Sequence, residues 1–239
     1  MGLIKSAVAD GVLTLMWVFC SSTFGILTSL VAAATGVQGL KYPSLFITTA
    51  LVFLFVLVFN VIGDAMGGAS FNPTGTASFY AAGLTHDSLI SLSVRFPAQA
   101  AGAVFGVLAV KEFLPAKYQH MVRGPYLKVE LHTGAIAEGV LTFVISFTVL
   151  FIILRGPRNK FLKIWLLAMS TVALVVAGST FTGPAMNPAN AFGWAYLNNK
   201  HNTWEQLYVY WICPFAGAIL AGWVFRAIFP PPPVKEKKA

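Results

Sequence analysis

The sequence predicts an all-α membrane protein with six transmembrane helices and two re-entrant half-helices, arranged as an inverted 3+3 repeat. Three observations predict it: an apolar composition, six apolar runs of membrane length, and two Asn-Pro pairs that each follow such a run. Hydrophobic residues make up 57% of the 239 residues and charged residues only 10%. Soluble domains carry about 25% charged residues. We therefore expect an integral membrane protein.

The six expected spans approach the roughly 20 residues that a helix needs to cross a bilayer. They are Ala7–Ala34, Ser44–Ile62, Leu89–Val110, Thr133–Leu154, Ile164–Ala177 and Glu205–Phe229. The fifth is short, and Phe161 and Leu162 extend it. Arg95 lies near the start of the third span, where we expect it to snorkel, with its stem in apolar surroundings and its guanidinium in water.

Each Asn-Pro pair carries the signals that start a helix. Asn72-Pro73-Thr74 follows the second span and Asn187-Pro188-Ala189 follows the fifth. Asparagine is a favoured N-cap because its side chain accepts from a free backbone N–H group, and proline suits the first helical position. The helices that follow are about ten residues long, too short to span a membrane. Irregular backbone at that depth must be buried in protein or line a water-filled cavity, so we expect both loops to fold into the bundle.

The two halves of the chain match each other at several positions. Asn187 follows Asn72 by 115 residues (187 − 72), and the same offset maps Gly102-Ala103 onto Gly217-Ala218. In the first spans, Ala9–Thr14 matches Ala137–Thr142. A repeat of three spans is inserted upside down in its second copy, and inverted repeats place the functional site at the midplane on broken helices. We divide the chain into a first repeat (residues 1–110), a linker loop (111–131), a second repeat (132–229) and a cytosolic basic tail (230–239).

Two half-helices that meet at the centre of a membrane suggest a channel. Each helix N-terminus carries about half a positive charge, and two facing ends repel cations, including hydronium. The amides of Asn72 and Asn187 can donate to a passing water, which interrupts a chain of hydrogen-bonded waters. The plainer interpretation is two capped turns in a membrane bundle, and the pairing within a repeat favours the channel.

Asp10 and Glu138 are ionisable residues within spans, at repeat-related positions. Such residues suggest a function by default. We expect both to accept hydrogen bonds from the backbone of the re-entrant loops. The alternative is proton coupling in a secondary transporter.

The distribution of cations indicates the orientation. With the N-terminus in the cytoplasm, ten cations lie inside and six outside, which favours cytosolic termini. The inner set is Lys5, Arg95, Arg155, Arg158, Lys160, Lys163, Arg226, Lys235, Lys237 and Lys238, and the outer set is Lys41, Lys111, Lys117, Arg123, Lys128 and Lys200. We expect the four linker cations to be solvated. The net charge of +8 fits orientation and contact with anionic lipid, and no compact basic domain points to nucleic acid.

The last five residues place Lys235 and Lys237 in a Lys-x-Lys-x-x pattern. Coat proteins read this pattern for return to the endoplasmic reticulum, and the alternative is a basic tail that touches anionic lipid. No His, Cys or carboxylate cluster has metal-ligand spacing, and no nucleophile–base pair suggests catalysis. We expect no enzyme activity, no cofactor and no metal.

On these motifs the chain resembles the major intrinsic protein family, the aquaporins, over nearly its whole length. It is most similar to the plant small basic intrinsic proteins, in its basic charge, its short N-terminus and its altered first motif. The resemblance implies a right-handed six-helix bundle, one pore per chain, a homotetramer and an endoplasmic reticulum membrane.

The family's paired motif falls on the two Asn-Pro segments, with two departures. Thr74 stands where the family usually has alanine, and Asn190 where it usually has arginine. Counting along the family pattern, the narrow filter also includes Pro184, Val175 and Val52. Without the arginine, cation exclusion is expected to depend more on the half-helix dipoles. Water is the expected solute, and the alternatives are another small neutral solute and a weakly conducting or non-conducting membrane scaffold.

Overall fold

The computed structural model describes residues 2–85 and 87–230, and within them the chain is helical, with no strand. Six helical spans in this part of the chain are long and apolar enough to cross a membrane, as expected. The elements are α1 (Leu3–Ser21), α2 (Phe24–Ala34), α3 (Lys41–Ala65), α4 (Pro73–Ala81), α5 (Leu89–Phe113), the 3-10 helix η1 (Ala116–Met121), α6 (Leu131–Arg155), α7 (Lys160–Gly178), α8 (Pro188–Leu197), α9 (Trp204–Leu207), the π-helix η2 (Tyr208–Ile212) and α10 (Cys213–Ile228). Lys235 and Lys237 lie outside the described residues.

The two half-helices begin at the asparagines, because the side chains cap them. Asn72 Oδ1 accepts from the backbone N of Thr74 at 3.0 Å, and proline occupies the first position of α4. Asn187 Oδ1 accepts from the backbone N of Ala189 at 3.1 Å and of Asn190 at 3.3 Å. These bonds satisfy backbone donors that a helix start otherwise leaves free.

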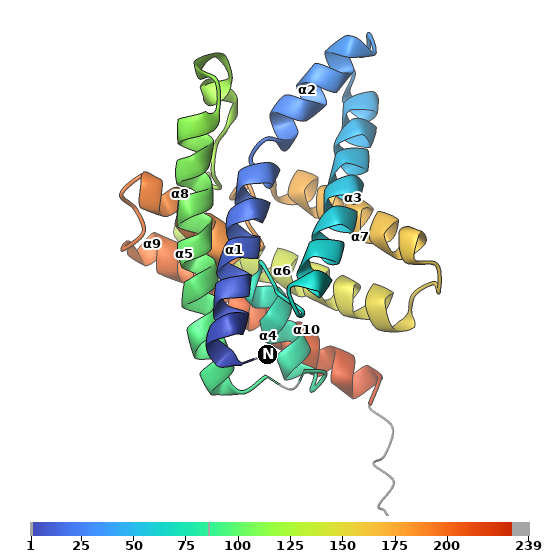
Figure 1. Cartoon of the computed structure of the whole chain (residues 1–239), viewed down its shortest axis with the longest axis vertical. Helices are drawn as coiled ribbons and strands as arrows, with labels where there is room; N and C mark the ends of the chain where they lie inside the picture. The colour runs from blue at the N-terminus through green and yellow to red at the C-terminus, as the bar shows by residue number, and fades with distance from the viewer. Residues whose placement is uncertain (1, 86, 231–239) are drawn as a thin grey trace, which may run out of the picture.

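The first span consists of two helices where the sequence suggests one. It is interrupted at Ser22 and Thr23, between α1 and α2. The Ser22 hydroxyl donates to the Val18 carbonyl at 2.7 Å, and the Thr23 hydroxyl donates to the Cys20 carbonyl at 2.7 Å. Hydroxyl side chains that bond nearby carbonyls compete with the helical ladder and bend it. As a result α2 leans away from α1 towards α3 (Figure 1).

The helices of each half pack in the same way. α1 lies along α5 (Figure 1), and a Cβ added at Gly102 of α5 would collide with the Gly11 carbonyl of α1. In the second half, a Cβ at Gly217 of α10 would collide with the Gly139 carbonyl of α6. Small residues allow such close approach between membrane helices. Gly102 and Gly217 are the glycines that the sequence offset of 115 residues relates (217 − 102).

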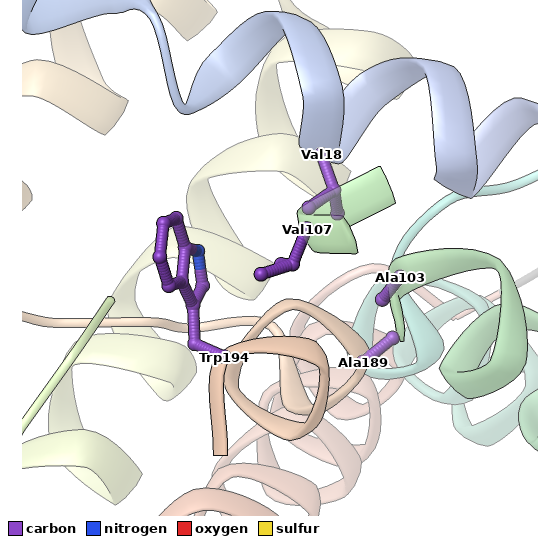
Figure 2. Packing of buried hydrophobic residues seen from close by; sticks show 5 residues of the cluster. All are labelled: Val18, Ala103, Val107, Ala189 and Trp194. Atoms are coloured by element: carbon purple, nitrogen blue, oxygen red, sulfur yellow. The ribbon is translucent and has the colours of Figure 1, made fainter. Parts of the chain in front are cut away.

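A small apolar core fixes the second half-helix against the first half of the chain. It contains Val18 of α1, Ala103 and Val107 of α5, and Ala189 and Trp194 of α8, all buried. Figure 2 shows Ala103 of α5 and Ala189 of α8 next to each other where the two helices cross, and the Trp194 ring next to Val107. Short side chains at the crossing let the tip of α8 reach the interior of the bundle.

Candidate functional site

The tips of the two half-helices meet, and each asparagine binds the opposite loop. Asn72 Nδ2 donates to the carbonyl of Met186 at 3.0 Å. Asn187 Nδ2 donates to the carbonyl of Phe71 at 3.0 Å. Each amide nitrogen carries two hydrogens, so one N–H group of each asparagine is left for another acceptor.

Thr74 takes part in this junction and does not face open space. Its side chain is buried, with 1% of the residue exposed. The hydroxyl lies 2.8 Å from Asn72 Oδ1 and 3.1 Å from the Met186 carbonyl, and its single hydrogen can be donated to either oxygen. The hydroxyl that departs from the family pattern therefore adds a donor to the link between the loops.

Each loop is held by a fully buried carboxylate. Asp10 Oδ1 accepts from the backbone N of Ser70 at 2.9 Å. Glu138 accepts from the Thr182 hydroxyl at 2.7 Å and from the backbone N of Ala185 and Met186 at 2.9 and 3.1 Å. Met186 has a φ of 45°, a left-handed conformation that costs energy for a residue with a Cβ. Glu138 thus holds the strained backbone immediately before Asn187.

Arg95 does not snorkel to an interface, and that expectation is wrong. The residue is 7% exposed and its guanidinium binds Asp10 through two bonds, Nε to Oδ2 at 2.8 Å and Nη2 to Oδ1 at 2.9 Å. Gln99 also donates to Asp10 Oδ2 at 2.7 Å. A buried carboxylate in a membrane needs polar partners, and for Asp10 the adjacent helix provides a charged one, Arg95.

The third nitrogen of Arg95 binds Asp87, which lies in the loop after α4. Arg95 Nη1 is 2.9 Å from Asp87 Oδ1, and the same carboxylate accepts from the hydroxyls of Thr85 and Ser91. Partial burial works to raise the pKa of Asp87, but these hydrogen bonds and the charge of Arg95 outweigh it, so the pKa lies below its usual value. The network ties α1, α5 and the loop after the first half-helix together.

The residues expected to form the filter lie around one cavity of about 510 Å³. Its walls include Val52 of α3, Val175 of α7, Pro184 of the second loop and Asn190 of α8. Asn187 also lines it. Linker residues Arg123 and Lys128 also line it, and we call it the linker-side cavity. A second, polar cavity of about 450 Å³ lies beside the first loop and includes Asp10 and Arg95.

Four residues around this site were not identified from the sequence. They are Asp87, Gln99, Thr85 and Lys128. The signal for Gln99 was the buried Asp10, since an intramembrane carboxylate requires donors, whereas Asp87 binds Arg95 and does not contact Asp10. Lys128 was expected to be solvated with the other linker cations. It is exposed, yet its Nζ donates to the Ser179 carbonyl at 2.6 Å.

Comparisons with known proteins give one consistent result. The family model described as "Major intrinsic protein" matches residues 1–225. Aquaporin SIP1-2 of Zea mays is 58% identical over 238 residues, covering 99% of this chain and 98% of its own. Aquaporin SIP1-1 of Arabidopsis thaliana is 55% identical, covering 100% and 98%. The X-ray structure of the aquaglyceroporin from Plasmodium falciparum matches with a TM-score of 0.70 at 16% identity, covering 96% of this chain and 98% of that one.

Proposed function

The chain belongs to the major intrinsic protein family, close to the plant small basic intrinsic proteins, and from this membership we propose that it conducts water passively through a pore within each chain. Family and relatives support a multi-pass membrane channel for water or small solutes. The finer proposal concerns the path. Water passes from the linker-side cavity, between Asn72 and Asn187, to the polar cavity beside the first loop.

The reciprocal contact of the two half-helix tips is the observation on which this proposal rests. Asn72 and Asn187 each use one amide hydrogen on the opposite loop and keep the other for a solute. The two helix N-termini add positive potential at the same point. A water molecule can donate its hydrogens away from such a point, whereas a cation or hydronium is repelled. The site therefore favours a neutral molecule.

A second candidate is the passage of another small neutral solute. The specific observation in its favour is the cavity of about 510 Å³, in which Val52, Val175 and Pro184 form an apolar wall. Asn190 takes the filter position where the family usually has a cation. A filter without that fixed cation has room and apolar surface for a solute larger than water.

Proton-coupled transport is disfavoured by the environment of the carboxylates. The two oxygens of Asp10 accept four hydrogen bonds, from Ser70, Gln99 and twice from Arg95. Those of Glu138 accept three. These bonds hold both carboxylates in place as supports of the loops, whereas a proton carrier needs a carboxyl group that is free to exchange its proton with water. A non-conducting scaffold predicts the absence of any flux, and a weakly conducting one predicts a small flux.

We propose a location in the endoplasmic reticulum membrane, with both termini cytosolic. The cation bias and the Lys235/Lys237 pattern support this. In Figure 1 the N-terminus and the last turns of α10 lie at the same end of the molecule, away from η1 and the linker. From the family resemblance we also propose a homotetramer and, for the tail, recognition by coat proteins. The division at residues 110, 131 and 229 into two repeats, a linker and a tail belongs to the same proposal.

Stopped-flow light scattering of reconstituted vesicles tests the function. Wild-type vesicles are expected to shrink faster than empty vesicles in an osmotic gradient. Asn187→Asp keeps an oxygen for capping α8 but removes the donor to Phe71, so we expect slower shrinkage. A panel of small neutral solutes tests the second candidate. Wild-type vesicles that shrink no faster than empty ones would refute the water channel, and the absence of every flux would support the scaffold.

A further inference from the structure

Two cationic side chains line the linker-side cavity, whereas the residue at its filter position, Asn190, is neutral. Among the described residues that line this cavity, Arg123 and Lys128 are charged and none is a carboxylate. Asn190 occupies the filter position without a charge. A positive potential at this mouth therefore comes from the linker and from the N-terminus of α8.

Lys128 is fixed in place by both its backbone and its side chain. Its backbone N donates to the Phe181 carbonyl at 2.9 Å, and the backbone N of Tyr126 donates to the Thr182 carbonyl at 2.9 Å. The linker thus pairs with the segment that leads into the second loop. At the side chain, Nζ donates to the Ser179 carbonyl at 2.6 Å and lies 4.6 Å from the centre of the Tyr126 ring. A cation over an aromatic face is stabilised by it.

These contacts place the ammonium group next to the filter. Ser179, which accepts its hydrogen bond, lines the cavity, and so does Gly183. Nζ lies 4.0 Å from the position that a Cβ on Gly183 would occupy. Gly183 directly precedes Pro184, one of the expected filter residues. The charge is therefore held a few ångströms from Gly183, the neighbour of Pro184 in the cavity wall.

We propose that Lys128 is a specificity-determining residue that excludes cations at the linker-side mouth, in place of the cation absent from position 190. This inference rests on the proposed function, since it assigns the charge that protects the same pore. Lys128 acts through a fixed position beside the pore wall. Arg123, an exposed cation, lines the same cavity.

The expected effect follows from the repulsion of like charges. Two unit charges about 4 Å apart in water change the local cation concentration about fivefold, and more where the cavity wall lowers the effective dielectric constant. Removing the charge should raise sodium or potassium leak through the protein about tenfold at low ionic strength. The difference in cation leak between the variant without the charge and wild type should shrink at high salt, because salt screens an exposed charge. Water flow, which involves a neutral molecule, should change less than about twofold by the same reasoning.

The experiment measures cation leak and osmotic water flow in the same vesicle preparations. The variants are Lys128→Gln, which removes the charge, and Lys128→Arg, which keeps it. Lys200→Gln in the loop before α9 is the control for loss of any single cation, and Arg123→Gln measures the contribution of the second cation that lines the cavity. We expect Lys128→Gln to leak more than Arg123→Gln, and Lys128→Arg and Lys200→Gln to stay close to wild type.

The outcomes separate the two proposals. If wild type conducts water but Lys128→Gln is as cation-tight as wild type, the inference about Lys128 is overturned and the water channel stands. The inference is also overturned, and the water channel again stands, if Lys200→Gln leaks cations as much as Lys128→Gln. If wild type conducts neither water nor neutral solutes, the proposed function fails and the role of Lys128 fails with it. Recovery of every variant as a monodisperse protein shows that a leak does not reflect misfolding.

Discussion

Asn72 and Asn187 bind each other's loops at the residue directly before the opposite asparagine. Asn72 Nδ2 donates to the carbonyl of Met186, and Asn187 Nδ2 donates to the carbonyl of Phe71, both at 3.0 Å. The bonds lock the two helix tips together. Each asparagine therefore caps its helix, joins the loops and presents one further N–H group. The first three predictions test parts of this arrangement and its support.

The first prediction concerns the stability provided by Asn72. Asn72→Ala removes the cap on the Thr74 N–H group and one donor to the Met186 carbonyl. The Thr74 hydroxyl can still donate to the Met186 carbonyl, so we expect the loss of a cap, about 1 kcal/mol, and of one hydrogen bond, about 0.5–1.5 kcal/mol, or about 1.5–2.5 kcal/mol in total. Asn60→Ala is the matched control, because its exposed amide also bonds a carbonyl, at 2.7 Å. Unfolding in detergent measures the loss of free energy of unfolding in both variants. Equal losses in Asn72→Ala and Asn60→Ala would contradict a special role for Asn72.

The second prediction concerns Thr74. The Thr74 hydroxyl is buried between Asn72 and Met186. Thr74→Ala should therefore lower the free energy of unfolding by about 1 kcal/mol and leave the relative fluxes of the neutral solutes unchanged. Thr74→Val, which keeps the volume and loses the hydroxyl, should behave in the same way. Vesicle flux and thermal unfolding measure the two quantities. A new solute preference in either variant would show that Thr74 faces the path.

The third prediction concerns the buried pair of Asp10 and Arg95. Arg95→Met leaves Asp10 buried without its counter-charge, which costs about 3–5 kcal/mol. The double variant Asp10→Asn/Arg95→Met removes both charges and should recover part of that loss. Arg158→Gln, at an exposed arginine, should change stability by less than about 0.5 kcal/mol. A similarly small effect of Arg95→Met would indicate a snorkelling arginine after all.

The fourth prediction is a pH dependence that comes from Asp87. Its pKa in the folded protein is lowered, so the carboxylate contributes stability above its unfolded pKa of about 3.9, and this contribution is lost as the pH falls through the lower folded value. Asp87→Asn should therefore lower the melting temperature at pH 7, and the gap from wild type should close below about pH 4. Comparing the two proteins at each pH cancels the titration of the other carboxylates. A constant gap would contradict this assignment.

Local signals predicted the parts of the fold that local chemistry decides. The Asn-Pro pairs predicted the starts of α4 and α8, because N-capping and the fixed φ of proline act within a few residues. Apolar run length predicted the six spans. The interruption after Ser21 was missed, because Ser22 and Thr23 bend a helix through hydroxyl bonds that composition does not reveal.

Long-range pairing limited what could be predicted of the site. Arg95 and Asp10 are 85 residues apart in sequence, and a cation considered by itself near a membrane interface is expected to snorkel. The contact of α1 with α5 decides otherwise, by placing the guanidinium against the carboxylate. Lys128 was grouped with solvated linker cations for the same reason. Its position depends on the pairing of the linker with Phe181 and Thr182.

The most direct test of a pore between the half-helices is to block the cavity that leads to it. Val175 lines that cavity on α7, and Met169 lies on the same helix with 47% of its surface exposed. Osmotic shrinkage of vesicles should fall to the rate of empty vesicles for Val175→Trp and stay at the wild-type rate for Met169→Trp. Shrinkage of Val175→Trp vesicles at the wild-type rate would contradict water flow along this path.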